Sequence, residues 1–151
     1  AWTYGVGVIS EADRKLLQVT HDALFEGLKH AKAGNRLTDI SHAIGEYVFA
    51  HGYSIPRDYT GHGVGRSVHE DPAVPNFGPA GYGVVLKPGM TIAVEPMVLA
   101  GRPQTKVLKD GWGVASKDGS RSAHYEHTIA ITNNGYEIFT TLKKEEHPEN
   151  G

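Results

Sequence analysis

The chain has 151 residues, enough for one domain that buries roughly 68–70% of the surface its unfolded chain exposes. The formal net charge is −2 and the basic residues are scattered, so the wide positive surface of a nucleic-acid binder is absent and we expect no nucleic-acid partner. Cysteine is absent, which excludes thiolate sites and fits a reducing compartment, and no apolar run approaches the roughly 20 residues of a membrane-spanning helix, so we expect no membrane partner.

The first third of the chain is predicted to contain a strand end and two helices. Residues 1–9 read as the end of a strand, because they are rich in aromatic and β-branched side chains. Ser10 is a helix N-cap candidate, and the apolar residues that follow at helical spacing predict an amphipathic helix over residues 11–32. A second helix is predicted to begin at Thr38 and to end before Gly52. We interpret both helices as scaffold, because nothing on their polar faces converges.

The stretch YTGHGVGRSVHEDP, residues 59–72, carries two histidines, acidic side chains and three glycines. His62 and His69 are seven positions apart, so a fully extended chain would place them on opposite faces. Bends at Gly63 and Gly65 would bring them back together. Two interpretations stay open for this stretch: a surface loop with exposed histidines, or a site that binds a metal or a substrate.

Two predicted strands in the second half each carry a carboxylate in apolar company. Residues 90–98 form a largely apolar run that Glu95 interrupts, and residues 124–132, which include Glu126, alternate as a strand with one buried face. A carboxylate in such surroundings costs free energy unless it is paired, protonated or bound to a cation. One such residue is most often a structural ion-pair member, but two of them together with His62 favour a metal site.

That ligand set has a defined chemistry. Two carboxylates and one imidazole suit Mn, Fe, Co or Zn, and carboxylates can bridge two divalent ions. Ions of this kind activate water as a nucleophile near neutral pH.

The remaining second-half signals concern the sheet and the domain boundary. Asn133, Asn134 and Gly135 form the strongest hairpin signal, and residues 136–141 are predicted to pair back onto the preceding strand. Residues 143–151 are interpreted as a charged tail, and no linker divides residues 1–142. The domain is therefore expected to span residues 1–142.

Three long stretches carry a resemblance to a known family. They are GHGVGRSVHEDPAVPNFG at 61–78, LKPGMTIAVEPM at 86–97 and KDGWGVASKDGSRSAHYEHTIAIT at 109–132. With them, the chain from about residue 2 to about residue 141 resembles the C-terminal half of type I methionine aminopeptidases. Xaa-Pro aminopeptidases and dipeptidases share the GHG, HE and Glu-Pro pattern, whereas the Val-Pro-Asn segment at 74–76 and the Ser-Ala-x-Tyr-Glu-His-Thr segment at 122–128 are peculiar to the methionine enzymes.

The resemblance implies both a fold and a function. The fold is α+β, with two helices on one face of a curved, mainly antiparallel sheet, as the C-terminal lobe of the pita-bread (creatinase/aminopeptidase) fold. The function is removal of the initiator methionine from nascent polypeptides or peptides in the cytoplasm, with two divalent metal ions (Mn, Fe, Co or Zn). Two alternatives stay open: another pita-bread peptidase, such as an Xaa-Pro aminopeptidase or dipeptidase, and a non-catalytic binding module or inactive fragment.

The resemblance also implies roles for individual residues. His62, Glu95 and Glu126 match three of the family's five metal ligands, with Glu126 shared between two ions. His69 matches the catalytic histidine that contacts the peptide group of the substrate, and Glu95 is also a candidate general base. Trp112 matches an aromatic residue at the rim of the methionine pocket.

This sequence departs from the family pattern in three ways. Val68 stands where the family has a larger Phe or Met, so one wall of the pocket is expected to be looser. His124 stands where the family commonly has Gln, which is expected to alter the surroundings of Glu126. The other two ligands are aspartates that precede the segment resembling residues 1–4, so we expect the missing N-terminal half of the fold as a partner and no activity from this chain alone.

Overall fold

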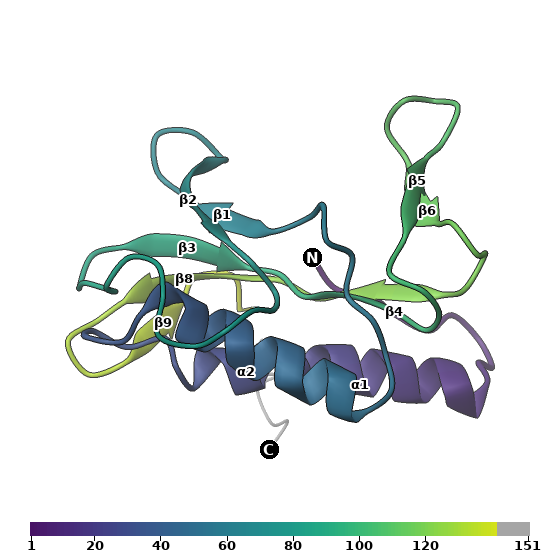
Figure 1. The fold of residues 1–151 in the computed structure, drawn as a ribbon, viewed down its shortest axis with the longest axis horizontal. Coiled ribbons are helices and arrows are strands. Elements are labelled where there is room, and N and C mark those ends of the chain that lie inside the picture. Colours follow the sequence, from purple (N-terminus) through teal and green to yellow (C-terminus); the bar gives the residue numbers. More distant parts are fainter. Residues whose placement is uncertain (142–151) are drawn as a thin grey trace, which may run out of the picture.

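In a computed structural model that describes residues 1–141, two helices lie against one side of a layer of short strands (Figure 1). The predicted tail at 143–151 lies outside the described residues. The helices are α1 (Glu11–Leu28) and α2 (Leu37–Ala50). The strands are β1 (Gly61–Gly63), β2 (Glu70–Val74), β3 (Thr91–Val94), β4 (Met97–Leu99), β5 (Thr105–Val107), β6 (Val114–Ser116), β7 (Ser122–His124), β8 (His127–Ile131) and β9 (Tyr136–Ile138).

Helix α1 begins as predicted and ends earlier than predicted. The Ser10 hydroxyl accepts a hydrogen bond from the backbone N–H of Asp13 at 3.1 Å, which confirms Ser10 as the N-cap. The helix ends at Leu28 and not at residue 32, because the N–H of His30 bonds to a carbonyl three residues back and tightens the last turn.

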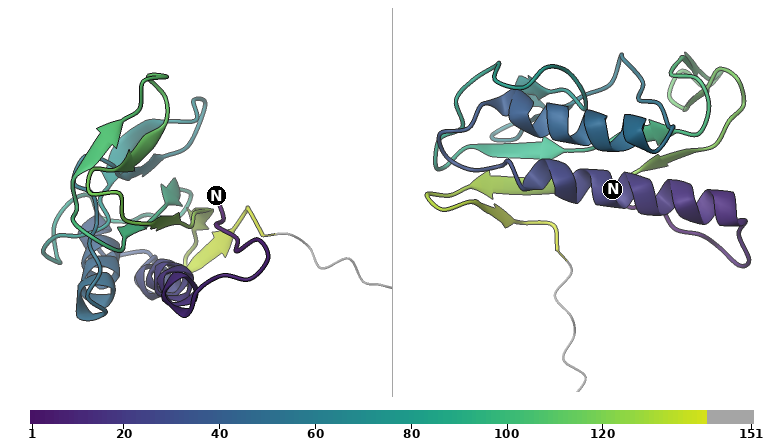
Figure 2. Two further views of the ribbon diagram at one scale, coloured as in Figure 1. Left: turned by 90° about the vertical axis from the view of Figure 1, so that its right-hand side faces the viewer. Right: turned by 60° about the horizontal axis from the view of Figure 1, so that its bottom comes forward.

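The two helices approach each other closely at Gly27 of α1. A Cβ atom at this position would lie 2.6 Å from Cγ1 of Ile44 and 3.3 Å from Cγ2 of Ile40, both on α2. Only a residue without a side chain allows this spacing. The helix pair covers one face of the sheet, as the end-on view in Figure 2 shows. Neither helix has the length and apolar character that crossing a bilayer requires.

Five strands form the main sheet in the order β2-β1-β3-β8-β9, and each neighbouring pair is antiparallel. Strands β4 and β7 form a second, two-stranded sheet, and β5 and β6 form a hairpin that projects from the layer (Figure 1). The predicted hairpin at Asn133–Gly135 is confirmed, because it joins β8 to β9 and the N–H of Thr132 donates to the carbonyl of Gly135. The α+β prediction with a mainly antiparallel sheet is therefore confirmed.

The two long strands predicted around Glu95 and Glu126 are each interrupted. Pairing of β3 with β8 stops at Val94 and His127, and pairing of β4 with β7 begins at Met97 and His124, two residues from Glu95 and Glu126 respectively. Pro96 has no N–H to contribute to a ladder, which explains the break. The predicted single strands are therefore wrong in length, and both carboxylates lie at the junction between two sheets.

The predicted strand at residues 1–9 is also wrong. The N–H of Glu126 donates to the carbonyl of the first residue at 2.9 Å, but the next contacts use a side chain: Thr3 Oγ1 bonds to both the carbonyl (2.8 Å) and the N–H (2.9 Å) of His124. Gly7 then turns the chain with a φ of +68°. The segment is therefore attached to β7 by hydrogen bonds of the Thr3 hydroxyl group and not by a ladder of backbone hydrogen bonds.

The core lies between the helices and the sheet. It consists of aliphatic side chains from both layers: Leu24, Leu28, Ile40, Ile44, Val48, Ile92, Val94, Val98, Ile129 and Ile131. Alternate residues from Ala123 to Ile131 are buried, which confirms the predicted alternation. The core thus takes up the face of β3 and β8 that points toward the helices. Polar side chains can therefore gather on the opposite face of these two strands.

Candidate metal centre

His62, Glu95 and Glu126 converge on one point of the sheet. One ligand atom from each lies within 4.8 Å of the other two. The register explains this, because His62 pairs with Ala93 on β3 and Ala93 pairs with Thr128 on β8. Glu95 and Glu126 lie two residues from these partners, on the same face of the sheet.

The glycines on either side of His62 allow the strand to fit here. A Cβ atom at Gly61 would lie 2.2 Å from the carbonyl oxygen of Ala93, and one at Gly63 would lie 2.1 Å from that of Asp71. Both clashes are with backbone atoms, which have little room to move. The GHG sequence therefore places an imidazole between two positions where the neighbouring strands leave no room for a side chain.

The orientation of the His62 ring leaves one nitrogen available. Nδ1 lies 2.8 Å from the carbonyl oxygen of Gly63, which can only accept, so Nδ1 donates. Nε2 is then the acceptor in the neutral ring, and it lies 3.3 Å from Oε1 of Glu95. A neutral imidazole held in this tautomer is suited to bind a metal through Nε2.

The second carboxylate oxygen of Glu95 faces His124. Nε2 of His124 lies 3.3 Å from Oε2 of Glu95, and this buried atom has no hydrogen-bond partner among the described residues. The sequence predicts that His124 alters the surroundings of Glu126. The structure places it against Glu95, because His124 pairs with Met97 at the start of β4.

This set of donors fits a divalent cation. Within residues 1–141, the carboxylate of Glu95 lies beside the imidazoles of His62 and His124, and that of Glu126 pairs with the amino group of Ala1 at 3.1 Å. Two carboxylates this close repel each other unless a positive charge lies between them. An imidazole nitrogen and two carboxylates are ligands that Zn, Mn, Fe or Co accept.

His69 lies next to this group and outside it. The rings of His62 and His69 have their centroids 4.3 Å apart at an angle of 57°. His69 is exposed, on the loop between β1 and β2 that folds back on itself, and it is not among the converging ligand atoms. The bend around the glycines therefore brings the two histidines together.

The structure does not bring Val68 and Trp112 together. Val68 is 71% exposed on the β1–β2 loop, and Trp112 is 90% exposed on the loop between β5 and β6. These loops rise from the same side of the sheet and are separated along its length (Figure 1). Backbone N–H groups of Trp112 and Gly113 donate to Asp110 and lower the pKa of its carboxyl group, which fixes the loop tip.

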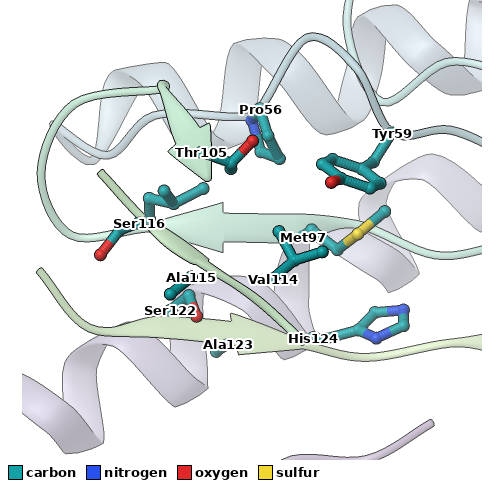
Figure 3. A pocket seen from close by; sticks show the side chains of 11 residues that line it. Pro56, Tyr59, Met97, Thr105, Val114, Ala115, Ser116, Ser122, Ala123 and His124 are labelled. Atoms are coloured by element: carbon teal, nitrogen blue, oxygen red, sulfur yellow. The ribbon is translucent and has the colours of Figure 1, made fainter. Parts of the chain in front are cut away.

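A cavity of about 320 Å³ lies between the two-stranded sheet and the β5–β6 hairpin. Tyr59, Met97 and His124 gather at one end of it (Figure 3). Because His124 also contacts Glu95, this end of the cavity lies next to the cluster of His62, Glu95 and Glu126. Neither Val68 nor Trp112 is among its lining residues.

Sequence reasoning missed Asn76, which it treated only as part of a motif. The Asn76 amide donates from Nδ2 to the backbone carbonyl of Glu95 at 3.1 Å. A polar side chain within the apolar run from Val74 to Phe77 was the signal that could have marked it.

Comparisons with known proteins place the chain among metallopeptidases. Residues 1–133 match the model of Metallopeptidase family M24. The chain is 54% identical over 142 residues to methionine aminopeptidase 1 of Bacillus subtilis. The aligned region covers 94% of this chain and 57% of that protein. A crystal structure of methionine aminopeptidase from Thermotoga maritima superposes with a TM-score of 0.91 at 51% identity, over 93% of this chain and 57% of that chain.

A more distant likeness shows the same fold. Xaa-Pro dipeptidase from Bacillus anthracis superposes with a TM-score of 0.72 at 26% identity, over 95% of this chain and 35% of that one. These likenesses confirm the expected pita-bread fold, and the chain spans a little over half the length of the curated relatives it matches. Because the family match extends over most of its length, the chain belongs to metallopeptidase family M24.

Proposed function

We propose that this chain supplies three metal ligands to a methionine aminopeptidase, which removes the initiator methionine by hydrolysing the first peptide bond. The convergence of His62, Glu95 and Glu126 within 4.8 Å carries this proposal. The higher similarity to methionine aminopeptidases than to the Xaa-Pro enzyme supports the choice of substrate. The substrates are then nascent polypeptides and peptides that begin with methionine, in the cytoplasm.

His62, Glu95 and Glu126 would hold two divalent ions, with Glu126 shared between them. When bound, such ions polarise the scissile carbonyl and lower the pKa of water. Glu95 has two oxygens at the site and accepts the proton that the attacking water loses. Mn, Fe, Co and Zn all suit this donor set.

The exposed histidine completes the reaction chemistry of this lobe. A ring nitrogen of His69 donates a hydrogen bond to the substrate peptide group and stabilises the negative charge that develops on its oxygen. Its ring rests 4.3 Å from that of His62, centroid to centroid, so a substrate held by the ions lies within its reach. Val68 and Trp112, on the two loops that flank the site, are proposed to contact the methionine side chain.

The complete site needs more than this chain. Two carboxylates do not neutralise two divalent ions in a closed cavity, so further acidic ligands are required. We propose that the first half of the fold provides them. The 151 residues alone are then expected to bind metal weakly and to leave peptides uncleaved.

The deciding assay uses Mn(II) or Co(II), a Met-Gly peptide and an Ala-Pro peptide. The chain is assayed alone and together with a separately produced polypeptide that corresponds to the part of the Bacillus subtilis relative not covered here. We expect cleavage of Met-Gly only when both polypeptides are present, with the His62→Ala chain as the inactive control. Cleavage of Ala-Pro in preference to Met-Gly would support the Xaa-Pro alternative, and metal binding that survives His62→Ala would contradict the site itself.

A further inference from the structure

Glu95 occupies a position where the sheet does not fix its backbone. It follows the last residue of β3 and precedes Pro96, which cannot donate a hydrogen bond. Its carbonyl group accepts instead from a side chain, Nδ2 of Asn76, at 3.1 Å. The peptide that carries a proposed metal ligand is thus held by an amide from a different segment.

Asn76 is itself held firmly. It is 1% exposed, and the segment around it packs on α2 at Gly45, where a Cβ atom would lie 2.9 Å from Cβ of Phe77 and 3.5 Å from the carbonyl oxygen of Asn76. Gly45 thus allows the helix backbone to support the segment directly. Helix α2 thus packs on the segment that carries Asn76, and Asn76 in turn donates to the carbonyl of Glu95.

The hydrogen bonding of Asn76 is incomplete. Its Oδ1 atom is buried and has no hydrogen-bond partner among the described residues. An unsatisfied buried acceptor destabilises a fold, so an apolar side chain of similar size would suit the packing better. The amide is therefore better explained by what its donor does for Glu95 than by what the residue does for stability.

We propose that Asn76 is a positioning residue for the metal ligand Glu95. Rotation of the Glu95–Pro96 peptide would move the carboxylate, whose two oxygens each lie 3.3 Å from a histidine nitrogen, those of His62 and His124. Asn76 prevents that rotation. The inference rests on the proposed metal role of Glu95 and deepens it, because partners behind a ligand set the ligand's orientation.

The test compares Asn76→Leu with Thr20→Val in the 151-residue chain. Asn76→Leu removes the donor and keeps the same number of side-chain heavy atoms. Thr20→Val removes another buried side-chain bond, from Thr20 Oγ1 to the carbonyl of Leu16 at 2.7 Å within α1. In the metal-free chain we expect the NMR ring signals of His62 and His124 to shift in Asn76→Leu and to stay in place in Thr20→Val.

Metal affinity is the second measurement, by titration with Co(II). Asn76→Leu is expected to weaken binding by about 10–100-fold, the usual effect of losing a partner behind a ligand, while Thr20→Val stays within about twofold. If Asn76→Leu does not fold, Asn76→Ala removes the donor with a smaller, uncharged side chain, and Gly45→Ala shifts the same segment from the helix side. Both are expected to shift the two histidine signals.

Two outcomes separate this inference from the proposed function. Unshifted histidine signals in folded Asn76 variants would overturn the positioning role, whatever the metal affinity. Shifted signals in a chain that binds no Co(II), even together with the polypeptide that supplies the first half, would support the positioning role and count against the metal function. Equal loss of affinity in Asn76→Leu and Thr20→Val would mean that Asn76 acts only through stability, and the inference would fail.

Discussion

Nε2 of His62 and Oε1 of Glu95 lie 3.3 Å apart, although the first belongs to β1 and the second follows the end of β3. The hydrogen bond from Nδ1 of His62 to Gly63 fixes the imidazole, and the Asn76 amide fixes the peptide of Glu95. The two proposed ligands are therefore each held by a hydrogen bond in the metal-free chain. Such preorganisation lowers the cost of binding an ion.

We expect His62→Ala to weaken Co(II) binding by more than the roughly 10–100-fold that follows loss of an outer partner, since a ligand itself is removed. The control is His42→Ala. His42 is a half-buried histidine on α2 whose Nδ1 lies 3.1 Å from the carbonyl of Gly78. Isothermal titration of both variants measures the difference, and equal weakening would show that His62 is not a ligand.

His69→Ala is expected to separate turnover from metal binding. Loss of one donor to a developing oxyanion lowers kcat by about 10²–10³-fold, and the metal content should stay constant because His69 is not among the converging ligands. The variant is assayed in the two-polypeptide complex, with the exposed His30→Ala as control. Metal loss in proportion to activity would instead make His69 a ligand.

Trp112→Ala tests the proposed pocket. Trp112 is 90% exposed, so its removal is expected to leave the melting temperature of the chain nearly unchanged. In the complex, KM for a methionyl peptide should rise, while Tyr82→Ala, at a 64% exposed aromatic residue, should leave it unchanged. A looser wall at Val68 also predicts partial use of norleucine peptides. Equal rates on methionine and alanine peptides would argue against the pocket.

Gly27→Ala is expected to destabilise the chain although alanine is the better helix former. The gain in helix propensity is about 1 kcal/mol, and forcing an extra methyl group into a packed core costs about 1–3 kcal/mol. The new Cβ would lie 2.6 Å from Cγ1 of fully buried Ile44. Urea unfolding should show that the penalty disappears in an Ile44→Ala background, where space is available; an additive result would contradict the steric explanation.

Asp118 predicts a dependence of stability on pH. Its carboxylate accepts from the N–H of Arg102 at 2.7 Å and from Ser120, and these bonds lower its pKa from 3.8 to about 2. Because the pKa is lower in the folded state, the stabilisation is present above the ordinary pKa and is lost as pH falls through about 2. Asp118→Asn should melt at a lower temperature at neutral pH, and the difference should narrow in acid. A pH-independent difference would contradict this.

Local signals in the sequence predicted the local structure. The Ser10 cap and the apolar spacing after it placed α1, and the Asn-Asn-Gly turn placed the β8–β9 hairpin, because each depends on neighbouring residues. The predicted N-terminal strand is wrong because the segment is held at β7 by the hydroxyl group of Thr3. Residues 1–9 carry no signal for this contact, since β7 lies far along the chain. The alternation of buried and exposed positions also predicted one continuous strand through Glu126. In the structure, the backbone pairing of β7 ends before Glu126 and that of β8 begins after it.

The candidate site was predictable as a set of residues and not as a geometry. Carboxylates in apolar runs marked Glu95 and Glu126, since burial of an acid needs a partner. The contact of His124 with Glu95 depends on the register of β4 against β7, which no local pattern encodes. The role of Asn76 depends on a bond to a backbone carbonyl, and sequence patterns carry no information about that pairing.

At the junction between the two sheets, the proposed metal ligands are not the residues that hold the strands together. Glu95 and Glu126 lie outside the paired strands, so changing either carboxylate to its amide leaves the cross-strand pairing as it is. In the complex with the first half of the fold, a single substitution is therefore expected to abolish activity and leave the scaffold intact. A Glu126→Gln protein of this kind could hold an uncleaved peptide in place long enough for its bound conformation to be determined.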